Sequence, residues 1–238
     1  MSLKQPLLSV VMATCNGERF LKQQLDSIFA QTFQDFELII CDDASRDDTL
    51  VILESYRQQF TAIKIYQNNT RLGIVRNFEK AIGLSTAPYI SLCDQDDIWH
   101  KDKLTRSMEA MTLMEHSSSI SSPLLVHTNL CMIDVENKVI EKSFFFFKKY
   151  NLQQEKDIAH IVGRCGVMGN TILMNRALQK RILPFPPILE VHDYWIALVN
   201  ELYGKRTTLN NPFSFCTDYM KTIVVILFLI LMHRIGLV

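Results

Sequence analysis

Three acidic residues stand close together in the middle of the chain, at Asp94, Asp96 and Asp97. They follow the apolar run Tyr89–Cys93, which predicts a buried strand. Two carboxylates one residue apart at a strand end can reach a cation and the ribose of a nucleotide, and such oxygens suit Mg²⁺ or Mn²⁺. The cation would neutralise a diphosphate and make it a better leaving group. The alternative is an acidic cap on the helix that begins near Lys101.

Polar residues also follow two earlier apolar runs. Thr14 and Asn16 come directly after Leu7–Ala13, and Asp42 comes directly after Phe36–Cys41. Both runs predict buried strands that end in turns. Asp42 can accept hydrogen bonds from a pyrimidine base, and Thr14 and Asn16 can contact the base or the ribose. Ordinary turn and capping chemistry is the alternative for these positions.

Three more candidates lie near predicted helix starts. Arg76 and Asn77 begin the third predicted helix, where they either face a phosphate or a base or are simply solvated. Asp193 precedes Tyr194 and Trp195 and is a candidate general base, since a positioned carboxylate can take a proton from an attacking hydroxyl. The alternative for Asp193 is a carboxylate that stabilises the start of its own helix.

Strand and helix patterns alternate four times in about the first 110 residues, which predicts βαβ units and a parallel sheet. Ligands of such sheets bind at the carboxyl ends of the strands, where these polar residues converge. The second half is less regular. We expect a strand at Leu124–Ile133 and a helix at Leu173–Leu183, whereas the run Phe144–Phe147 has no clear role. Three of the chain's eight glycines fall in Gly163–Asn170.

Composition narrows the class of protein. The chain has 238 residues, 48% of them hydrophobic and 21% charged, which is typical of a globular protein. Its 25 basic and 25 acidic residues balance, which argues against a dedicated nucleic-acid binder. None of the six cysteines forms a CxxC pair, and no G-x-G-x-x-G follows the first strand, which argues against a zinc ribbon and a dinucleotide dehydrogenase. The first residues match a signal peptide only weakly, because no clear cleavage region follows them. Cys41 and Cys93 lie inside apolar runs, which suits a reducing cytoplasm, so we expect a cytoplasmic protein.

Four segments, taken in order, resemble the family 2 glycosyltransferases: Ser9–Gly17, Cys41–Thr49, Asn69–Asn77 and Asp94–Trp99. The resemblance extends over residues 7 to about 212. It implies an α/β fold of the GT-A type, with a Rossmann-like, mostly parallel sheet flanked by helices and a less regular acceptor-binding half. It also implies the inverting transfer of a sugar from a nucleotide-diphosphate donor. A sugar nucleotidyltransferase is a weaker alternative, because it should carry a glycine-rich loop after the first strand.

The resemblance also assigns roles. The nucleotide-contacting positions are Thr14, Asn16, Asp42, Arg76, Asn77 and Asp94. The metal-binding positions for Mg²⁺ or Mn²⁺ are Asp96 and Asp94, and the catalytic base is Asp193. The positions expected at the acceptor site are Trp99, Gly169, Asn170, His192, Tyr194 and Trp195. The motifs look most like the rhamnosyltransferase-like branch, which implies dTDP-L-rhamnose as donor, with a UDP-sugar as the alternative. The acceptor would be a saccharide or lipid-linked saccharide in cell-surface polysaccharide synthesis.

The end of the chain departs from the family. We expect a GT-A domain over 1–218, with a nucleotide-binding half of about 1–115 and an acceptor half of about 116–218, and an apolar tail over 219–238. The family usually carries Tyr-Arg-x-His-x-x-Asn after the base, and this chain does not. The run Thr222–Met232 is too short to span a membrane, which takes about 20 residues, so a peripheral membrane anchor is one interpretation.

A frameshift is the other interpretation of the tail. Back-translation of Cys216–Ile223, read one base earlier, can encode Tyr-Arg-Leu-His-Glu-Asp-Asn, which matches the missing motif. The protein would then be a catalytically impaired remnant that binds nucleotide-sugars. The nucleotide sequence of the gene decides between the two interpretations.

Overall fold

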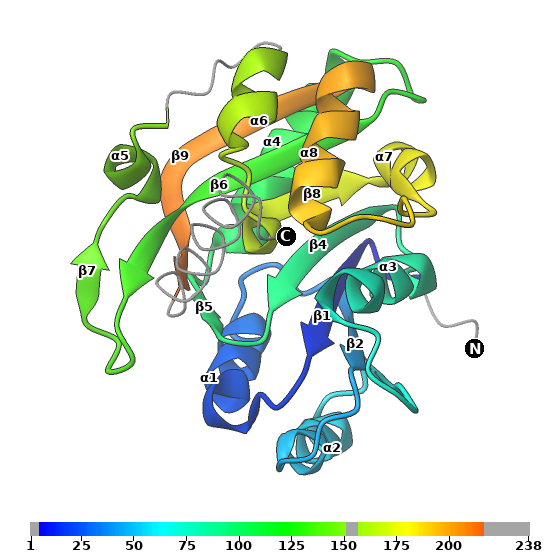
Figure 1. The fold of residues 1–238 in the computed structure, drawn as a ribbon, viewed down its shortest axis with the longest axis vertical. Helices are drawn as coiled ribbons and strands as arrows, with labels where there is room; N and C mark the ends of the chain where they lie inside the picture. The colour runs from blue at the N-terminus through cyan, green and yellow to red at the C-terminus, as the bar shows by residue number, and fades with distance from the viewer. Residues whose placement is uncertain (1–4, 151–156, 217–238) are drawn as a thin grey trace, which may run out of the picture.

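The computed structural model describes residues 5–150 and 157–216. In this part of the chain one sheet of nine strands has the order β3-β2-β1-β4-β8-β6-β9-β5, with β7 paired to β6. Helices cover both faces of the sheet (Figure 1). The expectations for the tail, including the missing motif and the frameshift, lie outside the described residues.

The first half consists of alternating strands and helices, as predicted. Its elements are β1 (Leu8–Thr14), α1 (Glu18–Phe29), β2 (Phe36–Asp42), α2 (Thr49–Gln59), β3 (Ile63–Gln67), α3 (Ile74–Leu84) and β4 (Tyr89–Asp94). Strand β1 pairs in parallel with β2 and β4, and β2 pairs in parallel with β3. In this register Thr14 lies opposite Asp42, and Ala13 opposite Asp94, so the predicted strand ends meet at one edge of the sheet.

The second half mixes strand directions. Its elements are β5 (Asp97–Trp99), α4 (Lys103–His116), β6 (Leu124–Ile133), β7 (Val139–Glu141), α5 (Phe144–Lys148), α6 (Ile158–Arg164), the 3₁₀ turn η1 (Gly169–Thr171), β8 (Ile172–Asn175), α7 (Arg176–Ile182), α8 (His192–Tyr203) and β9 (Lys205–Cys216). Strand β8 lies antiparallel between β4 and β6, while β9 runs parallel to β6 and carries β5 at the edge of the sheet.

The prediction of one helix over Leu173–Leu183 is wrong at its start. Ile172–Asn175 forms strand β8, and the helix α7 begins only at Arg176. A short apolar run does not distinguish a buried strand from a buried helix, and here the partners β4 and β6 select the strand. The Asn175 side chain then caps the helix by accepting a hydrogen bond from the Leu178 N–H, at 3.0 Å.

The two faces of the sheet bury two apolar cores. Alternate residues of a strand point to opposite faces, so Val10 and Met12 belong to one core and Val11 to the other. The first core also holds apolar residues of α1, α2 and α4, and the second holds residues of α3, α7 and α8. This packing fixes the helices against the sheet edge where the polar strand ends gather. No helix in the described ranges is long and apolar enough to cross a bilayer.

Candidate active site

The ends of β1 and β2 are joined by polar contacts. The Thr14 hydroxyl donates to Asp42 Oδ1 at 3.2 Å, and the Ser45 N–H donates to Asp42 Oδ2 at 3.0 Å. Asn16 has a left-handed backbone, and its side-chain oxygen accepts from the Arg46 N–H at 2.9 Å. Asp42 is fully buried, so its carboxylate shapes this pair of loops. Its direct contact with a base stays a prediction, whereas Asn16 is exposed beside it.

Asp43 holds a third loop against this edge. Its carboxylate accepts hydrogen bonds from the Asn68 side chain and from the N–H groups of Leu72 and Gly73, at 2.7 to 2.9 Å. Burial alone would raise the pKa of Asp43, but these hydrogen bonds outweigh burial and lower it. Asn77 is buried within the same network, where it accepts from Asn68 and donates to the Cys41 carbonyl.

Arg76, the one basic residue among the predicted site residues, has protein partners in this structure. The Arg76 guanidinium binds Glu79 and donates to the carbonyls of Pro186 and Pro187 at 2.7 and 2.8 Å, so in this structure it ties α3 to the segment before α8. Arg71 was not among the predicted site residues; it is an exposed cation whose charge acts on Cys15 and Asp43 at the strand ends. A basic residue in the loop after the third strand was the available signal.

Gln95 joins the acidic segment to the first loop. Its side-chain oxygen accepts from the Cys15 N–H at 2.9 Å, and its amide nitrogen donates to the Cys15 carbonyl at 3.3 Å. This two-point contact holds the neighbouring residues Asp94 and Asp96 beside the end of β1. The aspartates therefore lie next to the predicted nucleotide-binding loop.

Four carboxylates from distant parts of the chain are close enough to influence one another. Burial raises the pKa of Asp94 well above its usual range, and the negative charges of Asp97, Asp96 and Asp193 raise it further. The structure thus brings the predicted metal-binding pair and the predicted base to one place. Such crowding of negative charge is relieved by a bound cation.

The side chains at this edge supply only some of the ligands that a divalent metal needs. No group of three or more His, Cys, Asp or Glu side chains within residues 5–150 and 157–216 forms a metal site by itself. Mg²⁺ commonly takes one or two carboxylates and fills its remaining positions with phosphate oxygens and water. Asp94 and Asp96 fit that smaller share, so they would hold Mg²⁺ or Mn²⁺ together with a bound diphosphate.

The candidate base lies in the first turn of α8. Asp193 Oδ2 accepts a hydrogen bond from the Gly169 N–H at 3.0 Å, which orients the carboxylate. A Cβ atom at Gly169 would lie 3.1 Å from His192 Nε2, so glycine allows the turn η1 to approach α8 this closely. Gly169 thus lies directly against the predicted base.

The aromatic residues expected at the acceptor site have packing partners. The His192 ring stacks on Phe78 with centroids 4.2 Å apart, the Tyr194 hydroxyl donates to the Val162 carbonyl, and Trp195 Nε1 donates to the Ile182 carbonyl. These contacts anchor α8 on α3, α6 and α7. Their contact with an acceptor stays a prediction, and their observed effect is to fix Asp193.

Lys103, which was not among the predicted site residues, is buried near the acidic segment. It is 1% exposed, its Nζ donates to the Asn170 carbonyl at 2.5 Å, and it lies 3.6 Å from the centroid of the Trp99 ring. The Asn170 side chain donates to Asp97 Oδ2, also at 2.5 Å. Burial lowers the pKa of Lys103 and raises that of Asp97. Trp99 and Asn170, predicted at the acceptor site, are therefore buried around this cation.

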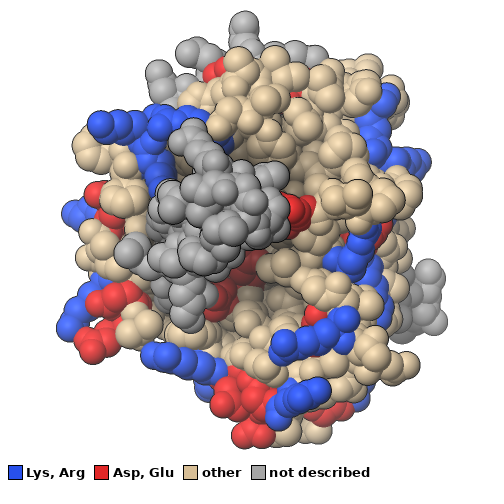
Figure 2. All heavy atoms as spheres, in the orientation of Figure 1, with Lys and Arg blue, Asp and Glu red and all other residues tan. Residues whose placement is uncertain are grey.

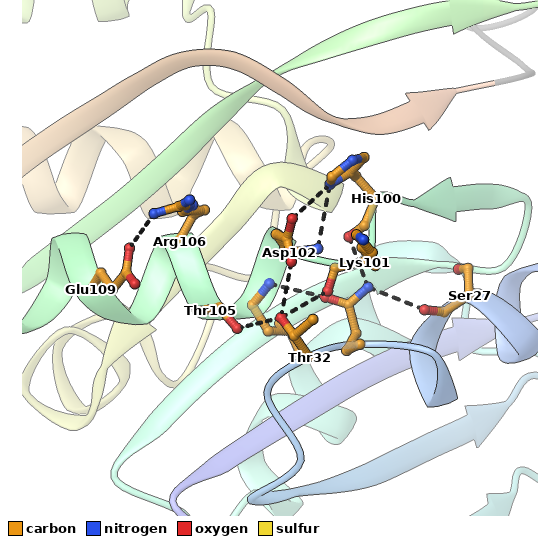
Figure 3. A network of polar contacts seen from close by, with 10 residues as sticks. Ser27, Thr32, His100, Lys101, Asp102, Thr105, Arg106 and Glu109 are labelled. Carbon is orange, nitrogen blue, oxygen red and sulfur yellow. Dashed lines mark hydrogen bonds and ion pairs between the residues drawn. The ribbon is translucent and has the colours of Figure 1, made fainter.

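The start of α4 is clamped by the loop after α1, which fixes Lys103 in place. The Thr32 N–H donates to the Lys101 carbonyl at 2.8 Å, and the Thr32 and Thr105 hydroxyls are 2.7 Å apart (Figure 3). The Leu104 N–H donates to the Gln31 side chain at 3.0 Å. A sequence signal for Lys103 existed, because it shares a helical stripe with the buried residues Ser107, Ala110, Met111 and Met114.

A mostly parallel sheet with acidic residues at its strand ends agrees with the GT-A fold that the sequence predicted. The family model described as glycosyl transferase family 2 matches residues 9–175. The chain therefore belongs to glycosyl transferase family 2, as the sequence predicted.

Two curated relatives show the range of similarity. The chain is 25% identical over 204 residues to the Escherichia coli UDP-Glc:alpha-D-GlcNAc-diphosphoundecaprenol beta-1,3-glucosyltransferase WfaP, a match that covers 85% of this chain and 74% of that protein. It is 34% identical over 121 residues to the Shigella flexneri dTDP-rhamnosyl transferase RfbG, which covers 49% of this chain and 42% of that protein. The chain spans less than half the length of several curated relatives that it matches.

Solved structures confirm the GT-A fold. S. aureus TarS 1-349 in complex with UDP-GlcNAc superposes with a TM-score of 0.68 at 23% identity, over 88% of this chain and 58% of that one. The mannosyltransferase PcManGT from Pyrobaculum calidifontis, in complex with GDP-Man and Mn²⁺, gives 0.64 at 16% identity, over 90% of this chain and 57% of that one.

Proposed function

We propose that this protein is an inverting, metal-dependent glycosyltransferase that moves a sugar from a nucleotide-diphosphate donor to a saccharide acceptor in cell-surface polysaccharide synthesis. The observation that carries the proposal is that the two halves of the chain meet at the carboxyl edge of the parallel strands. Asp193 accepts a hydrogen bond from the Gly169 N–H, and the next residue, Asn170, donates to Asp97, which follows Asp94 and Asp96. Ligands of such sheets bind at that edge.

Asp193 acts as the general base in this proposal. It accepts the proton of an acceptor hydroxyl, whose oxygen attacks the anomeric carbon from the face opposite the departing nucleotide diphosphate. The Gly169 N–H holds the accepting carboxylate in one orientation. A metal ion held by Asp94 and Asp96 would supply positive charge to the diphosphate.

The names of the relatives support a nucleotide-sugar donor. RfbG is a dTDP-rhamnosyl transferase, WfaP uses UDP-Glc, and TarS was crystallised with UDP-GlcNAc. We propose dTDP-L-rhamnose, or a hexose carried on UDP, as the donor. WfaP acts on a diphosphoundecaprenol-linked sugar, which supports a lipid-linked acceptor and a cytoplasmic location at the inner face of the membrane.

Donor screening tests the proposal. Thermal-shift measurements with dTDP-rhamnose, UDP-glucose and UDP-GlcNAc, each with Mn²⁺, should identify one stabilising donor. Donor hydrolysis and transfer are then assayed with wild type and Asp193→Asn. We expect the variant to bind the donor as wild type does and to lose turnover. Loss of donor binding by the folded variant would refute the role of Asp193, and stabilisation by none of the three nucleotide-sugars would refute the choice of donor.

One observation favours a second candidate. The family motif Tyr-Arg-x-His-x-x-Asn is missing after the base, which supports a remnant that binds nucleotide-sugars without turning them over. Donor binding by the wild-type chain with neither hydrolysis nor transfer would favour this second candidate over the enzyme.

A further inference from the structure

The phenylalanines of the run Phe144–Phe147 differ in how far their side chains are exposed. The run forms the short helix α5, in which Phe144 is 1% exposed and packs on Leu130 and Met132. In contrast, Phe146 is 79% exposed and Phe147 is 49% exposed. One phenylalanine therefore secures the helix, and two present their rings at the surface.

Strand β7 adds to this apolar surface. Val139 and Ile140 are 51% and 59% exposed, on a strand that pairs only with β6 among the described elements. We call Val139, Ile140, Phe146 and Phe147 the β7–α5 face. Several exposed apolar residues within one short segment of the chain are more typical of an interaction site than single scattered ones.

Basic residues surround the β7–α5 face. Lys142 and Lys149 are exposed, and the Lys148 ammonium lies 5.7 Å from the Phe147 ring. Burial lowers the pKa of Lys148, and the charge of Arg164 on α6 lowers it further. Figure 2 shows lysine and arginine side chains gathered over the region where Figure 1 places α5 and the end of α6.

The acidic residues of the same segment are engaged by neighbours. Glu136 pairs with Lys138 at 2.7 Å, and the Glu141 carboxylate accepts from the Ser143 N–H at 3.2 Å. The Asp134 carboxylate accepts from the N–H groups of Glu136 and Lys138, both at 2.9 Å. Exposed aromatic and aliphatic residues bordered by lysines are the pattern of segments that lie in the interface of an anionic bilayer.

The β7–α5 face is connected to the helix of the candidate base through α6. Tyr150, two residues after α5 ends, contacts the His160 ring of α6 with centroids 5.9 Å apart. Helix α6 in turn contacts α8, because the Tyr194 hydroxyl donates to the Val162 carbonyl at 2.8 Å, and α8 carries Asp193. An acceptor held at the β7–α5 face would therefore approach the base from that side.

We propose that the β7–α5 face docks on the surface of an anionic lipid bilayer. Phe146 and Phe147 enter the interfacial region, and Lys142 and Lys149 contact the lipid phosphates. The consequence for catalysis, that a lipid-linked acceptor is presented to Asp193, rests on the proposed function.

Vesicle co-sedimentation of the full chain tests the proposal. The probes are vesicles of phosphatidylcholine alone and of phosphatidylcholine mixed with phosphatidylglycerol. Wild type should bind the anionic vesicles more tightly than those of phosphatidylcholine alone, and this binding should weaken as the salt concentration is raised. Phe146→Ser with Phe147→Ser should weaken binding by about tenfold or more. Lys142→Gln with Lys149→Gln should weaken binding to the anionic vesicles by about fivefold for each lysine, and it provides a test if the phenylalanine variant fails to fold.

Matched controls isolate the face. Ile120 and Ile188 are 104% and 93% exposed and lie outside it, so Ile120→Ser with Ile188→Ser should bind vesicles as wild type does. Lys180→Gln on α7 is the charge control. Binding by both face variants within twofold of wild type would overturn the proposal, as would equal weakening by the controls.

Two further measurements distinguish membrane docking from failure of the proposed function and from contact between two copies of the chain. Donor stabilisation and donor hydrolysis in solution should be the same in the face variants and wild type. Vesicle binding that persists in a protein without donor binding would refute the proposed function and support the face. Light scattering that shows a wild-type dimer and a monomeric Phe146→Ser, Phe147→Ser variant would identify the face as a contact between two copies and overturn the membrane proposal.

Discussion

The substitution Lys103→Met removes the buried ammonium and leaves a side chain of similar length and volume. Lys103 is 1% exposed, so water cannot replace the lost contacts. The Asn170 carbonyl loses its donor at 2.5 Å, and the Trp99 ring loses a cation 3.6 Å from its centroid. Asp97 is left buried without a compensating positive charge nearby.

These losses set the size of the effect. A hydrogen bond to a charged group contributes about 1.5–3 kcal/mol, and a desolvated cation–π contact about 2 kcal/mol. Asp97 also loses the attraction of the Lys103 charge, and a buried charge left without compensation is unfavourable. The buried methionine recovers part of this, and Asp97, whose pKa is raised, can take up a proton. We therefore expect unfolding free energy to fall by about 3 kcal/mol, which lowers Tm by about 6–12 °C for a chain of this length.

Denaturant unfolding of four proteins measures the effect: wild type, Lys103→Met, Asp97→Asn and the double variant. The double variant should lose about 1–3 kcal/mol less than the sum of the single variants, because neither charge is then left alone. Arg106→Met is the control, since Arg106 is an exposed residue of the same helix paired with Glu109, and it should stay within about 0.5 kcal/mol of wild type.

Activity provides an independent readout. Asn170 follows Gly169, whose N–H orients Asp193, so Lys103→Met should lower kcat for donor hydrolysis more than it changes donor binding. Additive effects of the two single variants, or a loss below about 1 kcal/mol in Lys103→Met, would refute the view that Lys103 and Asp97 form one buried unit.

Three further predictions concern Gly169, the divalent metal and His127. Gly169→Ala places a Cβ atom 3.1 Å from His192 Nε2, and because His192 is stacked on Phe78, the first turn of α8 must shift. We expect kcat to fall by about tenfold or more, with little change in donor binding measured by calorimetry. Removal of divalent metal with EDTA should lower turnover by about tenfold or more and should be reversed by Mn²⁺, and full activity in EDTA would contradict the assigned role of Asp94 and Asp96. Burial, with a contribution from Arg206, lowers the pKa of His127 from 6.5 to about 3. The unfolded chain therefore takes up a proton at His127 before the folded chain does. The stability that neutral His127 contributes is complete above pH 6.5 and is lost as pH falls toward 3, by about 1.4 kcal/mol per pH unit. His127→Gln, which can keep the 2.8 Å contact with Thr208, should flatten that dependence in unfolding measurements, and an unchanged slope would show that another group is responsible.

The first half of the fold was predictable because its signals are local. Apolar runs of strand length, helical periodicity and polar turns alternate within short windows of the chain, and the right-handed βαβ rule then fixes parallel pairing. Strand β8 was missed, because its four residues are strand-like only between β4 and β6. The residues next to β8 in the sequence do not reveal that it will pair with these two strands.

The sequence by itself determined the family, the parallel strands and the collection of carboxylates at strand ends, since each depends on residues close together in the chain. Only the tertiary structure decided that Asp193 lies beside Asp94, that Lys103 is buried against Asn170, and that Phe146 is exposed while Phe144 is not. Each of these depends on segments that are distant in sequence and meet only when the sheet closes. Burial and pKa values follow from those meetings, because desolvation and nearby charge are properties of the packed molecule.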